Sequence, residues 1–202
     1  MQDKTIVFDL GAVLIDWDPR HLYRKVFDNE ADMEYFLRHI ATGEWNELQD
    51  AGRSLKEATE VLMYHYPEHG HHIQMYYDRW KEMLNGPIHD TVEILRSIKD
   101  QGYRILALTN WSDETFPVAM QEFEFLHWFE DILVSGREKL KKPDLAFFNL
   151  LLKRNNLDPA KTIFIDDNIR NVAAANHLGM EGIHFTSPRL LKLQLAERGV
   201  QV

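Results

Sequence analysis

The chain has 202 residues and a formal net charge of −9, from 23 Lys and Arg against 32 Asp and Glu, and it contains no cysteine. The lack of cysteine excludes disulfide scaffolds, thiolate zinc sites and cysteine nucleophiles. With 45% hydrophobic and 27% charged residues, the composition is that of an ordinary globular protein. The acidic balance argues against nucleic-acid binding, which depends on Lys and Arg neutralising phosphates.

No apolar run approaches the roughly 20 residues that a membrane-spanning helix needs. A strand-like run already begins at Thr5, which leaves no room for a signal peptide. We therefore expect a cytoplasmic protein that does not interact with membranes.

Five short apolar runs predict β-strands. The first, Thr5–Phe8, is rich in β-branched residues and ends at Asp9-Leu10-Gly11. The next three are nearly all apolar, as expected for strands covered on both faces, and the fifth is expected at the edge of the sheet. These four later runs are residues 104–108, 131–134, 162–165 and 182–185.

Helical patterns separate the strands from about residue 88 onward. Val92, Leu95 and Ile98 follow helical spacing before Gly102, and similar patterns occupy residues 147–151, 172–178 and 188 onward. Alternating strands and helices predict an α/β fold with a Rossmann-like, doubly wound parallel sheet.

Residues 16–85 interrupt this alternation and show no strand-like runs. Apolar spacing there predicts a set of amphipathic helices separated by turns at Gly43, Gly52, Pro67 and Gly70. We predict a core domain made of residues 1–15 and 86–202, with an inserted all-helical cap domain of residues 16–85. The expected cap helices are residues 22–27, 33–40, 55–64 and 73–84.

Polar residues follow the ends of the predicted strands. Because ligands of open α/β sheets bind at the carboxyl ends of the strands, these residues are expected to converge on one crevice. Each alone has a structural explanation, such as a helix N-cap for an Asp or a solvated surface for a Lys pair. The converging residues are Asp9, Gly11, Thr109, Asn110, Lys142, Asp166 and Asp167.

Three of these residues are carboxylates, which repel one another when they are brought together. Two unit charges about 4 Å apart cost about 4 kcal/mol at an effective dielectric constant near 20. Lys142 offsets part of this charge, and hard oxygen ligands favour Mg²⁺ over zinc for the remainder. Carboxylates, a divalent cation, a lysine and a hydroxyl together are suited to binding a phosphate group.

Four segments resemble motifs I to IV of the haloacid dehalogenase-like hydrolase superfamily, in the same order along the chain. The helical insertion resembles the type-1 cap of that superfamily, and the continuation Ile15-Asp16-Trp17-Asp18 is most similar to its alpha-D-glucose-1-phosphate phosphatase-like branch. The four segments are Phe8–Leu14, Leu108-Thr109-Asn110, Lys142-Pro143-Asp144 and Phe164–Asn168.

The resemblance implies a role for each of these residues. Asp9 would attack phosphorus and form an aspartyl-phosphate. Mg²⁺ would be held by Asp9, the Gly11 carbonyl and Asp167, with Asp166 close by as a second-shell or water-mediated ligand. The Thr109 hydroxyl and the Asn110 backbone N–H would bind phosphoryl oxygens. Lys142 would neutralise charge and orient Asp9.

Gly11 departs from the family pattern, in which a second Asp two residues after the nucleophile protonates the leaving group. General acid catalysis supplies about 10²–10⁴-fold, or roughly 3–5 kcal/mol of the barrier. We therefore expect a preference for less basic leaving groups, such as anomeric sugar phosphates, or a proton taken from water, Asp16, Asp18 or the substrate.

The sequence thus predicts a Mg²⁺-dependent phosphatase that hydrolyses a small phosphorylated metabolite, possibly a sugar phosphate. It does not determine the oligomeric state. A metal-independent 2-haloacid dehalogenase is a first alternative, against which the Asp166-Asp167 pair argues, because extra acids beside a nucleophilic carboxylate need a cation. A non-catalytic protein that binds a phosphate ligand is a second.

Other residues have simpler interpretations. The histidines at 65, 69, 71 and 72 flank Pro67 and Gly70, so we expect a solvated turn rather than a metal site. Core packing is the favoured role of Trp45, whereas Trp111 is expected either in the pocket wall or in the core. The run Arg137–Lys142 would form either an electropositive rim or, Lys142 apart, an exposed surface. Asp113 and Glu114 are expected to cap a helix.

Overall fold

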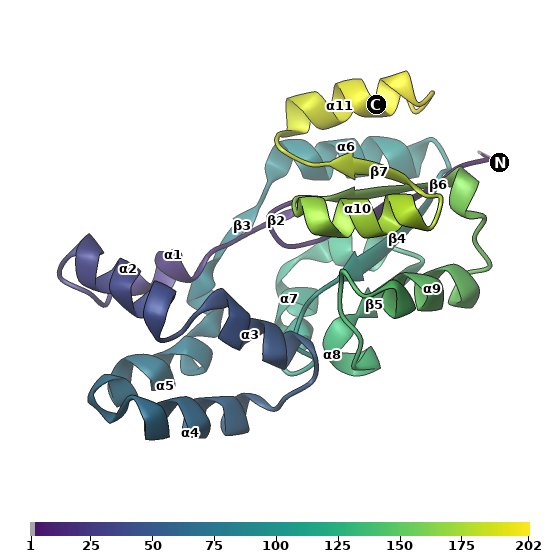
Figure 1. Cartoon of the computed structure of the whole chain (residues 1–202). Helices are drawn as coiled ribbons and strands as arrows, with labels where there is room; N and C mark the ends of the chain where they lie inside the picture. Colours follow the sequence, from purple (N-terminus) through teal and green to yellow (C-terminus); the bar gives the residue numbers. More distant parts are fainter. Residues whose placement is uncertain (1–2) are drawn as a thin grey trace.

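The computed structural model describes residues 3–202 (Figure 1). Its centre is a sheet of five parallel strands in the order β5-β4-β1-β6-β7. Both the parallel sheet and the edge position of the last strand confirm the sequence-based prediction. The strands are β1 (Thr5–Phe8), β4 (Arg104–Thr109), β5 (Asp131–Val134), β6 (Thr162–Asp166) and β7 (Glu181–His184).

Helices cover both faces of this sheet. Alternate residues of β1 point to opposite faces, so Ile6 and Phe8 belong to one apolar cluster and Val7 to another. The cluster around Val7 includes Phe147 and Leu151. The core helices are α6 (His89–Asp100), α7 (Phe116–Glu122), α8 (Ser135–Glu138), α9 (Leu145–Arg154), α10 (Ile169–His177) and α11 (Pro188–Glu197), with 3₁₀ turns η3 (Glu124–Trp128) and η4 (Pro159–Lys161).

The insertion lies apart from the sheet and consists of helices at lower left in Figure 1. Its elements are α1 (Pro19–Tyr23), α2 (Glu30–His39), α3 (Gly43–Asp50), α4 (Leu55–His65), η1 (Pro67–His69), α5 (Gly70–Asp78) and η2 (Trp80–Met83). We call this set of elements the cap.

Two short strands connect the cap to the core. β2 (Ile15–Trp17) and β3 (Leu84–Pro87) pair antiparallel, so residues 16–85 are not free of strands as predicted. These strands are too short and too polar to give a period-2 signal, since β3 contains Asn85, Gly86 and Pro87.

Helix α3 was also missed by the sequence analysis, which interpreted Gly43 and Gly52 as turn residues. Gly43 is in fact the first residue of the helix, and the Thr42 hydroxyl caps it by accepting a hydrogen bond from the Trp45 N–H at 3.1 Å. A Thr N-cap followed by Glu44 in the first turn is the local signal that could have identified it.

Polar contacts join the cap to the core. The Lys141 ammonium lies 2.6 Å from a Glu47 carboxylate oxygen on α3, and the backbone N–H of Leu55 donates to Glu114 at 2.8 Å. Glu114 therefore binds the first turn of the cap helix α4, and does not cap a core helix as predicted. These contacts place the end of α3 against the loops that follow β4 and β5.

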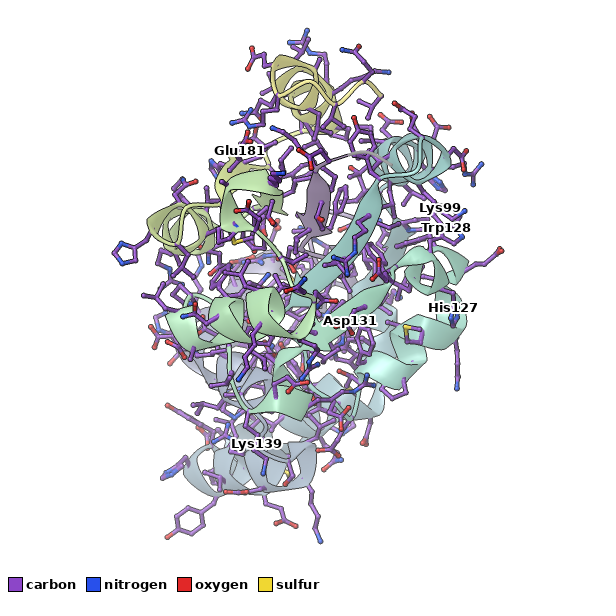
Figure 2. All side chains as sticks on the ribbon, turned by 90° about the vertical axis from the view of Figure 1, so that its right-hand side faces the viewer. Lys99, His127, Trp128, Asp131, Lys139 and Glu181 are labelled. Atoms are coloured by element: carbon purple, nitrogen blue, oxygen red, sulfur yellow. The ribbon has the colours of Figure 1, made fainter. Side chains whose placement is uncertain are left out.

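The opposite end of the sheet carries no predicted site residue. Figure 2 shows that end, where Asp131 begins β5 and the Lys99 ammonium lies 5.7 Å from the ring centre of Trp128. None of the helices in residues 3–202 is both long enough and apolar enough to pass through a membrane.

Gly52 follows α3 and has a backbone φ of +98°, and a Cβ built on it would lie 3.3 Å from the Gly136 carbonyl oxygen. We predict that Gly52→Ala destabilises the protein by about 1–3 kcal/mol, because it strains the backbone and crowds the cap–core contact. Gly43→Ala is the control, since nothing lies within 4 Å of a Cβ there. Urea unfolding measures both, and equal stabilities would contradict the prediction.

Candidate active site

Asp9 lies at the carboxyl end of the central strand β1. Its backbone N–H donates to Ile165 O at 2.8 Å, and its Oδ1 accepts the Leu10 N–H at 2.7 Å. The side chain is largely buried, with the whole residue 8% exposed. The strand pairing therefore fixes this carboxylate beside the end of β6.

Lys142 is the cation between two carboxylates. Its Nζ lies 2.9 Å from Asp9 Oδ1 and 2.7 Å from Asp166 Oδ2, and its side chain is almost completely buried. Burial lowers the pKa of Lys142, but the adjacent Asp166 and Asp9 carboxylates outweigh burial and raise that pKa above its ordinary value. The ammonium therefore stays charged and holds the two acids together.

Asn110 positions the backbone of Lys142. The Asn110 side chain accepts the Lys142 N–H at 2.8 Å and donates to the Lys142 carbonyl at 3.0 Å. This pair of bonds joins the end of β4 to the loop that carries the lysine. The amide of Asn110 thus has a structural task that is separate from the one predicted for its backbone N–H.

The two acids that follow β6 differ in their surroundings. Asp166 is fully buried and accepts hydrogen bonds from the Asn168 N–H at 2.8 Å and from Asn171 Nδ2 at 3.0 and 3.1 Å, in addition to Lys142. Asp167 is exposed, although partial burial of its carboxyl group and the nearby Asp166 charge raise its pKa. Of the two, Asp167 is the one available to a ligand.

Carboxylate oxygens of Asp9, Asp166 and Asp167 all lie within 4.8 Å of one another. Burial raises the pKa of Asp9 to about 7, with Asp166 and Asp167 adding to the rise and Lys142 opposing it. Among residues 3–202, no hydrogen bond uses Asp9 Oδ2. An open carboxylate oxygen beside the exposed Asp167 fits a hard divalent cation such as Mg²⁺.

Thr109 ends β4 beside these groups. Its hydroxyl is buried and has no hydrogen-bond partner among the described residues. A buried polar group without a partner costs about 1–3 kcal/mol. A ligand oxygen at this position would supply the missing partner.

A small cavity of about 70 Å³ lies between the cap and these strand ends. Gly11 lines it from the core, and a Cβ built on Gly11 would meet nothing within 4 Å. The space where a side chain at position 11 would lie is therefore open. The other lining residues are Trp17, Asn46, Asp50, Tyr77, Trp80, Asn110, Trp111, Ser112 and Thr115.

Asp50, the last residue of α3, is an acid in this cavity that the sequence analysis did not identify. Burial raises the pKa of Asp50 to about 7, and the neighbouring Glu47 adds to the rise while Lys141 opposes it. The Ser112 backbone also opposes the rise, and Asn46 Nδ2 lies 3.4 Å from Asp50 Oδ2.

Asp16 and Asp18, which the sequence offered as proton sources, have other partners. Asp16 accepts from Asn85 at 2.8 Å and lies 3.0 Å from His21 Nε2; burial raises its pKa, but these two contacts outweigh burial and lower it. Asp18 caps α1 through the Arg20 N–H. Neither acid is among the described residues that line the cavity, although Trp17, which lies between them in the sequence, does line it.

The histidines at 65, 69, 71 and 72 lie in α4, η1 and α5. Within residues 3–202 the Asp9 group alone has three or more metal-ligating side chains near enough to share an ion, so the histidines do not form such a site. Trp45 packs against Tyr76 and Tyr77 in the cap core, as favoured. Trp111 lines the cavity and is also buried, which combines both of its expected roles.

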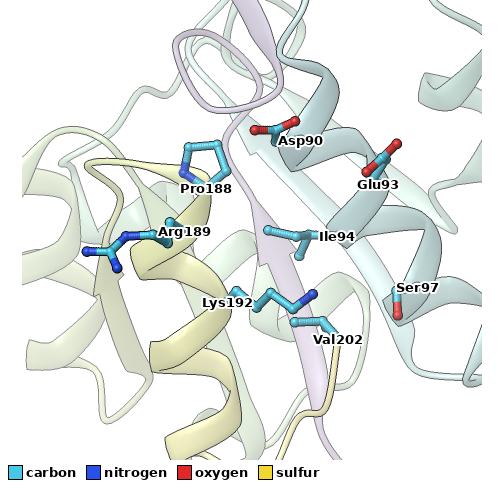
Figure 3. A pocket seen from close by; sticks show the side chains of 8 residues that line it. All are labelled: Asp90, Glu93, Ile94, Ser97, Pro188, Arg189, Lys192 and Val202. Carbon is cyan, nitrogen blue, oxygen red and sulfur yellow. The ribbon is translucent and has the colours of Figure 1, made fainter.

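The run Arg137–Lys142 is divided between several partners. Arg137 pairs with Asp113 at 2.6 Å, and Lys141 pairs with Glu47 in the cap. Asp113 thus binds this run instead of capping a helix. A separate groove of about 440 Å³ lies between α6 and α11; Asp90 and Glu93 line it from α6, and Arg189 and Lys192 line it from α11 (Figure 3). No predicted site residue lines that groove.

Residues 6–185 match the family model of the haloacid dehalogenase-like hydrolases. A sesquiterpene phosphatase of Aspergillus oryzae is 26% identical over 194 residues, which cover 96% of this chain and 95% of that protein. A variant of a HAD family enzyme from Bacteroides thetaiotaomicron, in complex with magnesium and inorganic phosphate, has a TM-score of 0.69 at 19% identity and covers 91% of this chain and 94% of its own. A dehalogenase has a TM-score of 0.71 at 19% identity, covering 96% and 97%. The structural matches confirm the fold class.

We predict that Lys142→Met lowers the free energy of unfolding by about 3–5 kcal/mol, because Asp9 and Asp166 are left as buried charges without their partner. Lys141→Met, which breaks a partly exposed pair, is the control and should cost less than about 1 kcal/mol. Urea unfolding in EDTA gives both values. Equal losses for the two variants would contradict the assigned role of Lys142.

We predict that the effect of Asp50→Asn on stability depends on pH. The pKa of Asp50 is about 7 in the folded protein and 3.8 ordinarily, so the folded state keeps a proton that the unfolded chain releases within this window. The stability from that proton is complete below about pH 4 and is lost as pH rises through 7. Asp50→Asn should therefore stabilise the protein more at pH 8 than at pH 5, relative to wild type.

The matched control is Glu44→Gln, an exposed acid-to-amide change on the same helix. Its effect on the free energy of unfolding, measured at the same two pH values, is the reference for the Asp50→Asn difference. An Asp50→Asn effect that does not change between pH 5 and pH 8 would contradict the raised pKa.

Proposed function

Because this chain belongs to the haloacid dehalogenase-like hydrolase family over residues 6–185, we propose that it is a Mg²⁺-dependent phosphatase acting on a small phosphorylated metabolite. The observation that carries the proposal is the cluster of Asp9, Asp166 and Asp167 around Lys142, next to the unpartnered Thr109 hydroxyl. This cluster combines a carboxylate nucleophile, a cation site and donors for phosphate. The similarity to a phosphatase over almost the whole chain supports the same reaction.

In the proposed reaction, Asp9 attacks phosphorus through one carboxylate oxygen and the P–O bond to the leaving group breaks. Lys142 holds Asp9 in place and balances its charge. The Thr109 hydroxyl and the Asn110 backbone N–H donate to phosphoryl oxygens. Water then hydrolyses the aspartyl-phosphate and restores Asp9.

Asp9, the Gly11 carbonyl and Asp167 would hold the Mg²⁺, and Asp166 would act behind them by fixing Lys142. When bound, the ion lowers the charge repulsion between the phosphate and the site acids. The hydrogen-bonded state of Asp166 and the exposure of Asp167 support this division between the two residues.

The cavity supports a small leaving group. Its volume is about 70 Å³. This volume is small, so a larger leaving group, whether a terpenyl group or a sugar, would need the cap to move outward. With the cap moved outward, aromatic rings from Trp17, Tyr77 and Trp80 beside polar Asn46 and Asn110 would suit a sugar, which has both apolar and hydroxyl faces.

We also propose that residues 16–85 act as a cap domain on a core of residues 1–15 and 86–202. The cap residues Asn46, Asp50 and Tyr77 line the cavity together with Gly11 and Asn110 from the core. Substrate selection would therefore depend on the cap, and phosphate chemistry on the core. Opening of the cap would admit the substrate.

A panel of sugar phosphates, nucleotides and p-nitrophenyl phosphate tests the function. We expect phosphate release that requires Mg²⁺, stops with EDTA and falls by at least about 10³-fold in Asp9→Asn, which lacks the nucleophile. Asp158→Asn is the control, because Asp158 caps η4 before the start of β6 and Asn is an equally good cap. Its activity should match that of wild type.

Two results would reject this function in favour of the alternatives. Chloride release from 2-chloropropionate in EDTA, with no phosphate release, would indicate a metal-independent dehalogenase. Phosphate binding without turnover of any panel member would indicate a non-catalytic binding protein. Activity that survives both EDTA and Asp9→Asn would contradict the mechanism.

A further inference from the structure

A phosphatase that releases an alcohol must supply a proton to the departing oxygen. An alkoxide is a poor leaving group, and proton donation by a positioned side chain contributes about 10²–10⁴-fold. In an in-line displacement the leaving oxygen lies opposite the attacking Asp9, on the side of the cap. The cavity between Gly11 and the cap occupies this side.

Among the described residues, those that the core contributes to the cavity lining include no acid. Gly11 has no side chain and leaves the adjacent space open. Asp166 is bound by Lys142, Asn168 and Asn171, and it lies behind the nucleophile. Asp50 is the acid among the residues that line the cavity, and it comes from the cap.

The structure holds Asp50 firmly against the core. Lys141 binds Glu47 on the same helix at 2.6 Å, and Ser112 of the core lines the same cavity as Asp50. Gly52 approaches Gly136 closely just after the helix ends. These contacts place the last residue of α3 at the cavity with the cap against the core.

We propose that Asp50 is the general acid of this enzyme, which protonates the leaving-group oxygen from the cap and replaces the acid that Gly11 cannot supply. The proposal rests on the phosphatase function proposed above. It also couples cap position to chemistry, because Asp50 reaches the reacting phosphate with the cap in contact with the core.

Every bond and proton is accounted for over one turnover. As Asp9 forms a bond to phosphorus, the P–O bond to the leaving group breaks and the leaving oxygen takes the proton from the Asp50 carboxyl group. The alcohol departs. The Asp50 carboxylate then takes a proton from the water that attacks phosphorus, the bond from phosphorus to Asp9 breaks, and both acids return to their starting states.

The charged surroundings of Asp50 agree with this role. Glu47 on α3 raises its pKa, while Lys141 and Lys142 from the loop after α8 lower it, and the phenols of Tyr76 and Tyr77 on α5 lie nearby. Burial is the largest influence and raises the pKa to about 7. A pKa near the working pH is favourable for a group that donates and then recovers a proton.

Leaving-group dependence tests the proposal. Wild type, Asp50→Asn, Glu44→Gln and the double variant Gly11→Asp, Asp50→Asn are assayed with Mg²⁺ on p-nitrophenyl phosphate and on the best alkyl phosphate of the panel. p-Nitrophenolate leaves without a proton, so Asp50→Asn should slow the hydrolysis of p-nitrophenyl phosphate by less than about tenfold. On the alkyl phosphate, Asp50→Asn should lower kcat by about 10²–10⁴-fold.

Glu44→Gln should behave as wild type on both substrates, since Glu44 is exposed and does not line the cavity. The Gly11→Asp change places a carboxyl group in the open space at position 11. The double variant should therefore hydrolyse the alkyl phosphate at least about tenfold faster than Asp50→Asn alone. Because misfolding lowers the rates on both substrates equally, the ratio of the two rates reports only the effect of proton donation.

Each contrary result has one meaning. Equal slowing of both substrates by Asp50→Asn, or no recovery in the double variant, would assign the loss to the position of α3 and overturn the proposal. A wild type that hydrolyses only the aryl phosphate would show that no acid operates and would also overturn it. A wild type inactive on both substrates would instead reject the phosphatase function itself.

Discussion

The structure depends most on one buried interaction, the ammonium of Lys142 between the carboxylates of Asp9 and Asp166. These acids end neighbouring strands, so the parallel register of β1 and β6 brings them together whatever their charge. Without a cation, the pair would repel strongly at the low effective dielectric of the interior. Lys142 makes this strand arrangement tolerable, and Asn110 fixes the backbone of Lys142 from β4.

The same arrangement leaves part of the site unsatisfied. Among residues 3–202, Asp9 Oδ2, Asp167 and the Thr109 hydroxyl lack the partners that Asp166 has, and they lie at one edge of the sheet. The core therefore supplies a stable frame and a set of open donors and acceptors. The cap supplies the other wall of the cavity and, in our proposal, the proton.

The sheet and most of the site could be predicted from sequence, because buried parallel strands are continuous apolar runs and their polar ends fall at one edge. The different states of Asp166 and Asp167 could not, since adjacent acids have the same pattern and are distinguished by burial and by the bonds of Asp166 to Lys142, Asn168 and Asn171. Helix α3 and Asp50 were missed because Gly43 and Gly52 resemble turns. The pKa of Asp50 depends on Ser112 and Lys141, which are distant in sequence.

A rapid acid quench with a radiolabelled phosphate ester and Mg²⁺ tests the central claim that Asp9, held by Lys142, attacks phosphorus. We predict that the quenched protein carries label within one turnover, that the label maps to the peptide containing Asp9, and that Asp9→Asn carries none. Release of labelled phosphate with no label on the chain at any time would contradict the account, because water would then attack the substrate directly.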